Sequence, residues 1–357
     1  MSANNPRIVI VGAGIVGATL AWHLSVRGAD VTLIDAGQPG SGVTGGAFGW
    51  ICVSHDQPEP LMALRHLATH EWRRLQRELG ERLEIDWCGA LTWSSDPADA
   101  ERLVRNHAAC GYDVRLMERS ELIAREPNLI DPPEVAAFAP IEGAIDAGPM
   151  TAVIAQAASE AGAVTHFHCS AQGLATTGGR VTGVRTAQGT LEADVVVLAA
   201  GTAIPALAEG LGDALPVESS PALLLRFHAP RRLVHTILNG PAVEMRDGGP
   251  GALRAADDFG PGSDADAIAR DTLAAIQRTL RGAEEVTVAG AEVGWRPMPA
   301  DGLPIIGFQP GFEGLYVTAM HAGVTLAPTV GRLAAAEILD GVTVAMLENL
   351  RPGRAGA

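Results

Sequence analysis

The sequence contains no lysine, and all 26 of its basic residues are arginine. A chain without lysine cannot form a lysine Schiff base, hold pyridoxal phosphate on a lysine, or bind a nucleotide phosphate with a Walker-type lysine. The formal net charge of -15 at pH 7 argues against a nucleic-acid partner, because phosphate backbones are bound by clustered basic groups. Lysine chemistry and nucleic-acid binding are therefore excluded from the candidate functions.

Cysteine and long apolar runs are also scarce. The four cysteines, Cys52, Cys88, Cys110 and Cys169, lie far apart without a C-x-x-C pair, so we expect neither a metal site nor a redox dithiol. The chain has no run of 18 uncharged apolar residues, and it starts without a basic segment. We therefore expect no membrane span, no secretion signal and a cytoplasmic location.

A nucleotide-binding pattern is present at the start of the chain. An apolar, β-branched segment at residues 7–11 leads into Gly12, Gly14 and Gly17, spaced G-x-G-x-x-G. A helix-length segment and a second apolar segment ending at Asp35 follow. Strand, glycines, helix, strand and acid in this order form the dinucleotide fingerprint, for which the alternative is an ordinary βαβ turn.

Each residue of this pattern has a physical role. We expect Gly12 to allow a tight turn, Gly14 to let a pyrophosphate approach the backbone, and Gly17 to let the helix pack close to the strand. The pyrophosphate would lie at the helix N-terminus, where free N–H groups and the helix dipole favour an anion. Asp35 would accept hydrogen bonds from the ribose hydroxyls.

The remaining chain predicts an α/β fold of two domains. We expect a discontinuous Rossmann-type domain from residues 1–85, 141–216 and 297–350, and an inserted substrate domain on a mostly antiparallel sheet from residues 86–140 and 217–296. The glycine-rich segment 36–50 predicts a loop whose amides contact a ligand. Gly178 and Gly179 predict a hairpin turn. Apolar periodicity over residues 61–79 predicts a helix used for packing, and a last helix is predicted from about residue 328 to 340, ended by Gly341.

Four segments together resemble the D-amino acid oxidase, glycine oxidase and sarcosine oxidase group of FAD-dependent oxidoreductases. They are the G-A-G-I-V-G run with Asp35, the small-residue loop at 41–50, the V-V-V-L-A-A-G run ending at Gly201, and R-P-x-x-x-D-G from Arg296 followed by H-x-G-V-T-L-A-P from His321. The resemblance implies oxidation of a CH–NH bond by hydride transfer to flavin N5. The substrate would be a carboxylate-bearing amine, namely a D-amino acid, a glycine- or sarcosine-like compound, or a cyclic secondary amino acid.

The resemblance also implies site residues. Arg296 would hold the substrate carboxylate, with a salt-bridged structural arginine as the alternative, and His321 would either contact substrate or lie as a satisfied histidine under the flavin. Trp50 is a further substrate-binding candidate, although core packing is its alternative. Gly323 would open the last helix and aim its positive end at the flavin. The candidate cofactor-binding residues are Gly12, Gly14, Ile15, Val16, Gly17, Asp35, Ala36, Ser41, Thr44, Gly45, Gly46, Ala47, Gly49, Ala171, Ala200, Gly201, Arg296, Ala322, Gly323, Val324 and Thr325.

Two departures from the resembled group bear on the cofactor and on the electron acceptor. Sarcosine-oxidase-like members use a lysine to activate oxygen and a cysteine to attach FAD, but this chain lacks lysine and has no cysteine near Arg296. We therefore expect noncovalent FAD, with oxygen, a quinone or a carrier protein as the electron acceptor. Alternative functions are a flavin-binding subunit of a heteromeric amino acid dehydrogenase and a biosynthetic tailoring amine oxidase. The choice between a homo-oligomer and a heteromeric complex stays open.

Overall fold

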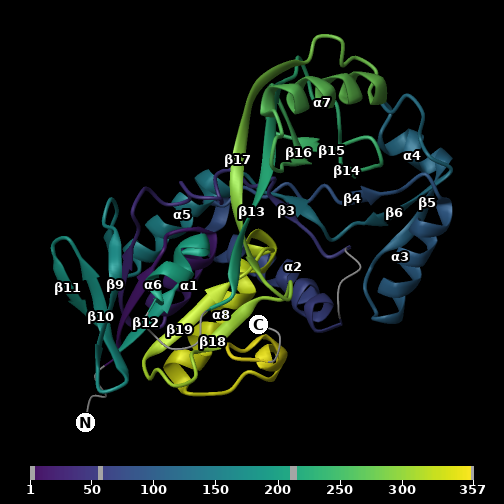
Figure 1. Ribbon diagram of the computed structural model, residues 1–357. Helices are drawn as coiled ribbons and strands as arrows, with labels where there is room; N and C mark the ends of the chain where they lie inside the picture. Colours follow the sequence, from purple (N-terminus) through teal and green to yellow (C-terminus); the bar gives the residue numbers. More distant parts are fainter. Residues whose placement is uncertain (1–4, 55–58, 210–214, 355–357) are drawn as a thin grey trace.

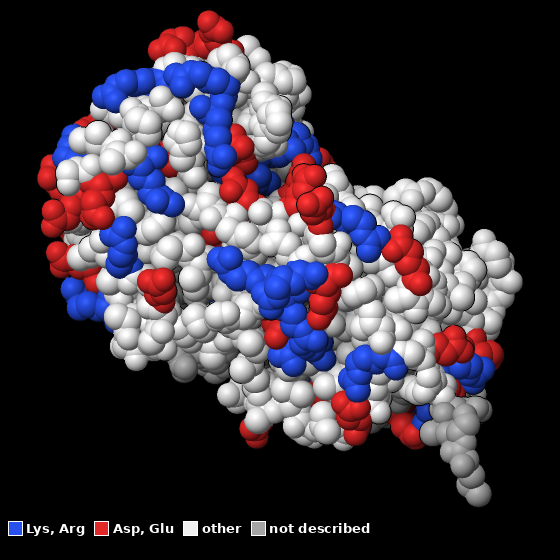
Figure 2. All heavy atoms as spheres, turned by 180° about the vertical axis from the view of Figure 1, so that it is seen from behind, with Lys and Arg blue, Asp and Glu red and all other residues white. Residues whose placement is uncertain are grey.

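The computed structural model describes residues 5–54, 59–209 and 215–354, which form two large sheets joined by long strands (Figure 1). No helix in these ranges is long and apolar enough to cross a membrane. On the face shown in Figure 2, arginines mostly lie beside acidic side chains. The combination of helices and sheets makes the fold α/β, as the sequence predicts.

The first sheet has six strands in the order β18-β19-β12-β1-β2-β8. All neighbours are parallel except β18, which runs antiparallel to β19. The strands are β1 (Arg7–Val11), β2 (Asp30–Ile34), β8 (Val164–His166), β12 (Val195–Leu198), β18 (Ile305–Phe308) and β19 (Leu315–Ala319). The apolar runs in β1 and β12 follow from this arrangement, because the sheet is covered on both faces.

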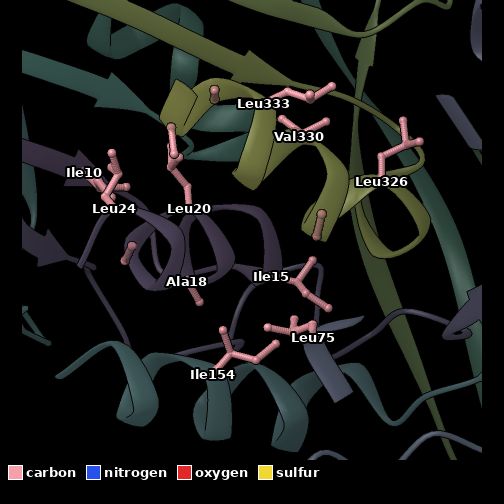
Figure 3. Close-up of a cluster of buried hydrophobic side chains, with 14 of the residues drawn as sticks. Ile10, Ile15, Ala18, Leu20, Leu24, Leu75, Ile154, Leu326, Val330 and Leu333 are labelled. Carbon is pink, nitrogen blue, oxygen red and sulfur yellow. The ribbon is translucent and has the colours of Figure 1, made fainter. Parts of the chain in front are cut away.

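Helices cover one face of this sheet. Ile8 and Ile10 of β1 pack with the helices α1 (Ile15–Ser25), α5 (Ala147–Glu160) and α8 (Gly323–Asp340), and Figure 3 shows part of this cluster. Val9 and Val11 point to the opposite face, where they pack with residues of β9 (Ala171–Thr177) and β10 (Arg180–Thr186). The sheet order brings the ends of β1, β2 and β12 side by side.

The second sheet has eight strands in the order β17-β13-β16-β15-β14-β4-β6-β5. Only the β14 and β4 pair is parallel, so the mostly antiparallel sheet predicted from the sequence is confirmed. The strands are β4 (Ala90–Thr92), β5 (Arg115–Glu118), β6 (Val135–Ala139), β13 (Val217–His228), β14 (Ile237–Asn239), β15 (Glu244–Asp247), β16 (Ala252–Asp258) and β17 (Thr287–Pro299). The long strands β13 and β17 reach down from this sheet toward the first one (Figure 1).

The two faces of the second sheet differ. Leu223, Leu225 and Met245 pack on one face beneath α7 (Ala265–Thr279), whose N-cap is Asp264. Because side chains alternate along a strand, Leu224 and Arg246 lie on the opposite face, toward the first sheet. This second face borders the candidate site described below.

Smaller elements complete the chain. The helices are α2 (Glu59–Leu79), α3 (Pro97–Ala109), α4 (Arg119–Arg125) and α6 (Ile204–Leu207), and the 3-10 turns are η1 (Gly80–Arg82), η2 (Gly201–Ala203) and η3 (Ala345–Leu350). The strands β3 (Trp50–Ile51) and β7 (Gly143–Ala144) pair with each other, and β11 (Gly189–Glu192) joins β10. The β9–β10 hairpin turns at Gly178 and Gly179, as predicted.

The last helix begins earlier than the sequence pattern predicts. It starts at Gly323, as the resemblance implies, and not near Pro328, which lies inside it; it ends at Asp340, with Gly341 as its left-handed C-cap. The predicted start was wrong because proline is favoured in the first turn of a helix, where its missing N–H costs nothing. Because Pro328 has no N–H, the carbonyl oxygen of Val324 lacks its usual helical donor, and the Trp72 indole N–H donates to it instead.

Candidate functional site

The turn after β1 is built on two glycines that no other residue can replace. Gly12 has φ of +107°, and a Cβ atom there would lie 2.5 Å from the carbonyl oxygen of Ala199. A Cβ atom on Gly17 would lie 1.9 Å from the carbonyl oxygen of Gly12. The predicted tight turn and the predicted close packing of helix on strand are both present in the structure.

The N-terminus of α1 faces an open cradle. A Cβ atom on Gly14, its N-cap, would meet only the Thr44 hydroxyl, at 3.3 Å. The Ile15 amide donates to that hydroxyl at 3.2 Å, and no side chain caps the helix at Gly14. The first-turn amides, which include Val16, have no acceptor within the helix. This end of α1 is therefore suited to bind an anionic group.

Asp35 is held rigidly at the end of β2. One carboxylate oxygen accepts from the Ala13 amide and the other from the Gly37 amide, both at 2.7 Å. The Cys169 amide donates to the Asp35 carbonyl oxygen, which brings the segment before Ala171 alongside. Each carboxylate oxygen retains acceptor capacity, and the residue is half-buried, so Asp35 can still accept from a ligand hydroxyl. Its neighbour Ala36 is exposed.

The predicted loop at residues 41–49 lies between the two sheets. Arginines of the second sheet hold its backbone, because Arg246 Nε donates to Phe48 at 2.6 Å and Arg226 Nη2 to Gly45 at 3.2 Å. Gly49 has φ of +81°, and a Cβ atom there would lie 2.0 Å from the carbonyl oxygen of Ile145. Internal turns and small side chains shape the rest, including Ser41, Gly46 and Ala47.

The N-terminus of α8 is fastened to β3. The Thr325 hydroxyl donates to the Trp50 carbonyl oxygen at 3.2 Å and accepts from the Cys52 amide at 3.1 Å. Because this side chain points into the protein, only the backbone of Thr325 can contact a ligand. The amides of Gly323 and Val324 lie in the first turn after the N-cap Ala322 and have no acceptor within the helix.

Arg296 lies on β17 beside the end of the first sheet. Its Nη2 donates to Ser220 Oγ at 3.0 Å and to the Pro221 carbonyl oxygen at 3.1 Å, while its buried Nε has no partner. Among the described residues no carboxylate pairs with it, which argues against a salt-bridged structural arginine. The next residue, Pro297, lies 3.9 Å from where a Cβ of Gly201 would be, so the segment containing Ala200 and Gly201 borders Arg296.

His321 lies close enough to Arg296 for their charges to interact. Desolvation, followed by the charges of Arg296 and Arg65, lowers the pKa of His321 to about 4, although part of the residue is exposed to solvent. The imidazole is therefore neutral at physiological pH. The structure thus brings together the two residues that the sequence proposed for catalysis.

Trp50 lies in a packed environment. It is buried in a small cluster with Cys52, and its indole N–H donates to Glu142 at 2.7 Å. Burial raises the pKa of the Glu142 carboxyl. These surroundings favour the packing interpretation of Trp50 over substrate contact.

Sequence reasoning missed several charged residues near the loop and near α8. Arg65 was counted with a packing helix, Glu142 follows a proline-rich break, and Arg246 and Glu244 alternate on β15. Desolvation and the charges of Asp258 and Asp257 raise the pKa of Glu244 to about 7. Only β15 carries a sequence signal for such residues, because Glu244 and Arg246 flank the apolar Met245 and so lie together on the face opposite to it.

Known proteins match almost the whole chain. The family model described as FAD dependent oxidoreductase (DAO) matches residues 7–337. A glycine oxidase of Geobacillus kaustophilus is 27% identical over 92% of this chain and 91% of that protein, and a D-amino acid dehydrogenase of Cereibacter sphaeroides is 27% identical over 94% and 92%. The crystal structure of the Geobacillus kaustophilus glycine oxidase covers 99% of both chains with a TM-score of 0.88 at 24% identity, which shows a shared fold. The crystal structure of L-proline dehydrogenase from P. horikoshii covers 98% of both chains with a TM-score of 0.89 at 22% identity.

Proposed function

This chain belongs to the family of FAD-dependent oxidoreductases, and we propose that it oxidises the CH–NH bond of an amine that carries a carboxylate. The family assignment makes the chain an FAD-dependent oxidoreductase among amino acid oxidases and dehydrogenases. The finer substrate class is our inference. It is supported by the relatives named glycine oxidase and D-amino acid dehydrogenase and by the unpaired Arg296 in the site.

The described residues fit FAD on three observations. Gly14 has no Cβ atom, which would lie only 3.3 Å from the Thr44 hydroxyl; the first-turn amides of α1 and α8 include some without an acceptor in the helix; and Asp35 retains acceptor capacity. We propose that α1 and Asp35 hold the dinucleotide part, and that the amides of Gly323 and Val324 provide the positive field near the flavin. The cofactor is proposed to be noncovalent, because the segment from Arg296 to Gly307 contains no cysteine.

Bound FAD supplies a two-electron acceptor, which takes a hydride from the carbon next to the substrate nitrogen. The residues of this chain bind and orient the substrate. Arg296 pairs with the substrate carboxylate and so fixes the position of the adjacent carbon. The neutral imidazole of His321 can exchange a hydrogen bond with the substrate without adding a charge. The substrate nitrogen releases its proton to solvent water, and the product leaves as an imine, which water hydrolyses to a carbonyl compound and ammonia or an amine.

The domain assignment remains a proposal that the site arrangement supports. We place the cofactor in residues 1–85, 141–216 and 297–350, and the substrate pocket against residues 86–140 and 217–296. The electron acceptor, whether oxygen, a quinone or a carrier protein, belongs to the same proposal.

The single observation that carries this proposal is the unpaired, half-buried Arg296 beside His321. Replacing Arg296 by leucine removes the proposed ion pair with the substrate carboxylate. We expect the FAD-loaded Arg296→Leu variant to have a substrate dissociation constant raised by about 100-fold, since hydrogen bonds between charged groups contribute about 1.5–3 kcal/mol each. Unchanged substrate affinity and turnover in this variant would show that Arg296 does not bind the carboxylate.

A further inference from the structure

Arg65 is a buried cation that forms no ion pair within the described part of the chain. The residue is 6% exposed and lies on α2, on the face that carries Ala68 and Trp72. Its Nη1 donates to the Cys52 carbonyl oxygen at 3.2 Å, and its buried Nε has no partner. No carboxylate of the described residues forms an ion pair with it. Arg65 is therefore a charge that the fold leaves unmatched.

A buried arginine cannot escape its desolvation cost by losing its proton. The guanidinium keeps its charge at every physiological pH, whereas a buried carboxylate such as Glu244 can become neutral. A buried charge without a partner is strongly unfavourable, so it is retained where a ligand supplies the opposite charge. The nearby Glu142 forms no ion pair with Arg65 and instead accepts from the Trp50 indole N–H and from the Val53 and Ser54 amides.

Arg65 and Arg296 both lie near His321. Both charges act on His321, which lies between the end of β19 and the start of α8. Arg65 comes from α2 and Arg296 from β17, and α2 packs beside the N-terminus of α8 (Figure 1). Cys52 accepts from Arg65 through its carbonyl oxygen and donates through its amide to Thr325 in the first turn of α8. Two guanidinium groups that form no ion pair among the described residues therefore lie near His321, and a single carboxylate would match only one of them.

We propose that Arg65 and Arg296 together bind a substrate with two carboxylates, one on each guanidinium, so that the preferred substrate is an amino or imino dicarboxylate. This inference rests on the proposed function and names its substrate class. The amine and the bond to be oxidised would lie between the two anchored carboxylates or next to one of them. Two charged anchors would also fix the substrate's orientation more strictly than one.

Unreactive carboxylates test the inference without turnover. Each dicarboxylate is paired with the monocarboxylate that lacks its second group: malonate with acetate, succinate with propanoate, and glutarate with butyrate. Dissociation constants are read from the change in the flavin absorbance of the holoenzyme. We expect at least one dicarboxylate to bind about 10- to 100-fold more tightly than its partner in the wild type.

Variants of the helix separate binding from structure. We expect Arg65→Gln to lose the dicarboxylate preference while monocarboxylate affinity changes little, and Arg65→Lys to keep part of the preference. Arg77→Gln is the matched control, because Arg77 is exposed on the same helix and makes no contact with the site. It should behave as the wild type.

Three results would overturn the inference: no dicarboxylate preference in the wild type, an equal loss of both ligand classes in Arg65→Gln, or a changed flavin reduction potential with unchanged ligand preference. The last result would place Arg65 against the cofactor. If amino monocarboxylates reduce the flavin and dicarboxylates have no advantage, the dicarboxylate inference is wrong while the proposed function stands. If no carboxylated amine reduces the flavin, the proposed function fails with it.

Discussion

The indole N–H of Trp72 in α2 donates to the carbonyl oxygen of Val324 in α8 at 3.0 Å. Val324 lies four residues before Pro328, which has no N–H to complete the helical hydrogen bond. The same indole lies 3.1 Å from the Thr325 carbonyl oxygen. Trp72 therefore replaces the donor that proline removes, and this allows α8 to extend back to Gly323 at the candidate site.

Trp72→Phe should destabilise the fold by about 1–3 kcal/mol beyond the loss of packing, because a buried carbonyl loses its partner. In the Pro328→Ala background the alanine N–H can bond to Val324, so the same substitution should cost about 1 kcal/mol less. Urea unfolding of the four proteins measures the difference. Equal costs in both backgrounds would show that the indole does not compensate for Pro328.

Gly17→Ala should disrupt the nucleotide-binding turn. Its Cβ atom would stand 1.9 Å from the Gly12 carbonyl oxygen, and both partners are backbone. Overpacking of this kind costs about 1–3 kcal/mol or more, and the displaced turn should reduce FAD content. Gly260→Ala is the control, because Gly260 lies outside the loop at residues 41–49 and its added Cβ would meet no atom within 4 Å beyond its chain neighbours. Thermal unfolding and the flavin-to-protein absorbance ratio report the two effects, and normal values for Gly17→Ala would refute the close-packing assignment.

Asp35→Ala should weaken FAD binding. It removes the acceptor for the Ala13 and Gly37 amides and the proposed acceptor for the ribose hydroxyls. We expect the FAD dissociation constant to rise about 10- to 100-fold, as for the loss of charge-assisted hydrogen bonds. Exposed Asp30 on the same strand supplies the control Asp30→Ala. Titration of the apoprotein with FAD measures both, and an unchanged constant in Asp35→Ala would remove Asp35 from the cofactor site.

Stability should fall in acid because of His23. Desolvation lowers its pKa to about 4; the charges of Arg74 and Arg332 also lower it, whereas Glu78 raises it. Between pH 6.5 and 4 the imidazole of His23 is protonated in the unfolded chain but neutral in the folded chain. The free energy of unfolding therefore falls as the pH falls through this window. The contribution of His23 to this slope should reach at most about 1.4 kcal/mol per pH unit.

His23→Leu should reduce this slope, while His228→Asn, at an exposed position, should not. The comparison requires urea unfolding at several pH values across the window. An identical pH dependence in wild type and His23→Leu would assign the acid sensitivity to other groups.

Local patterns predicted the parts of the fold that local physics decides. The turn at Gly12 and the hairpin at Gly178 depend on nearby residues alone. The start of α8 was mispredicted because Pro328 is tolerated only through Trp72, which lies far away in the sequence. Nothing in the local pattern around Pro328 contains that donor.

The candidate site was predictable where a motif carried it. Arg296 and His321 lie in the R-P-x-x-x-D-G and H-x-G-V-T runs, and the structure brings them within electrostatic reach. Arg65 was not identified, because one polar residue in an apolar helical stripe gives no signal until its burial and missing counter-ion are known. The arginines that hold the loop at residues 41–49 were missed for a similar reason, since their acceptors are backbone carbonyls of another segment.

Anaerobic mixing of the purified holoprotein with carboxylated amines tests the central claim most directly. The panel should contain glycine, sarcosine, L- and D-proline, D-amino acids and amino dicarboxylates, and the absorbance of bound flavin is followed. Our account predicts bleaching by at least one class, with the colour returning in air if oxygen is the acceptor and only after addition of a quinone or carrier if it is not. A yellow protein that none of these amines bleaches would contradict it.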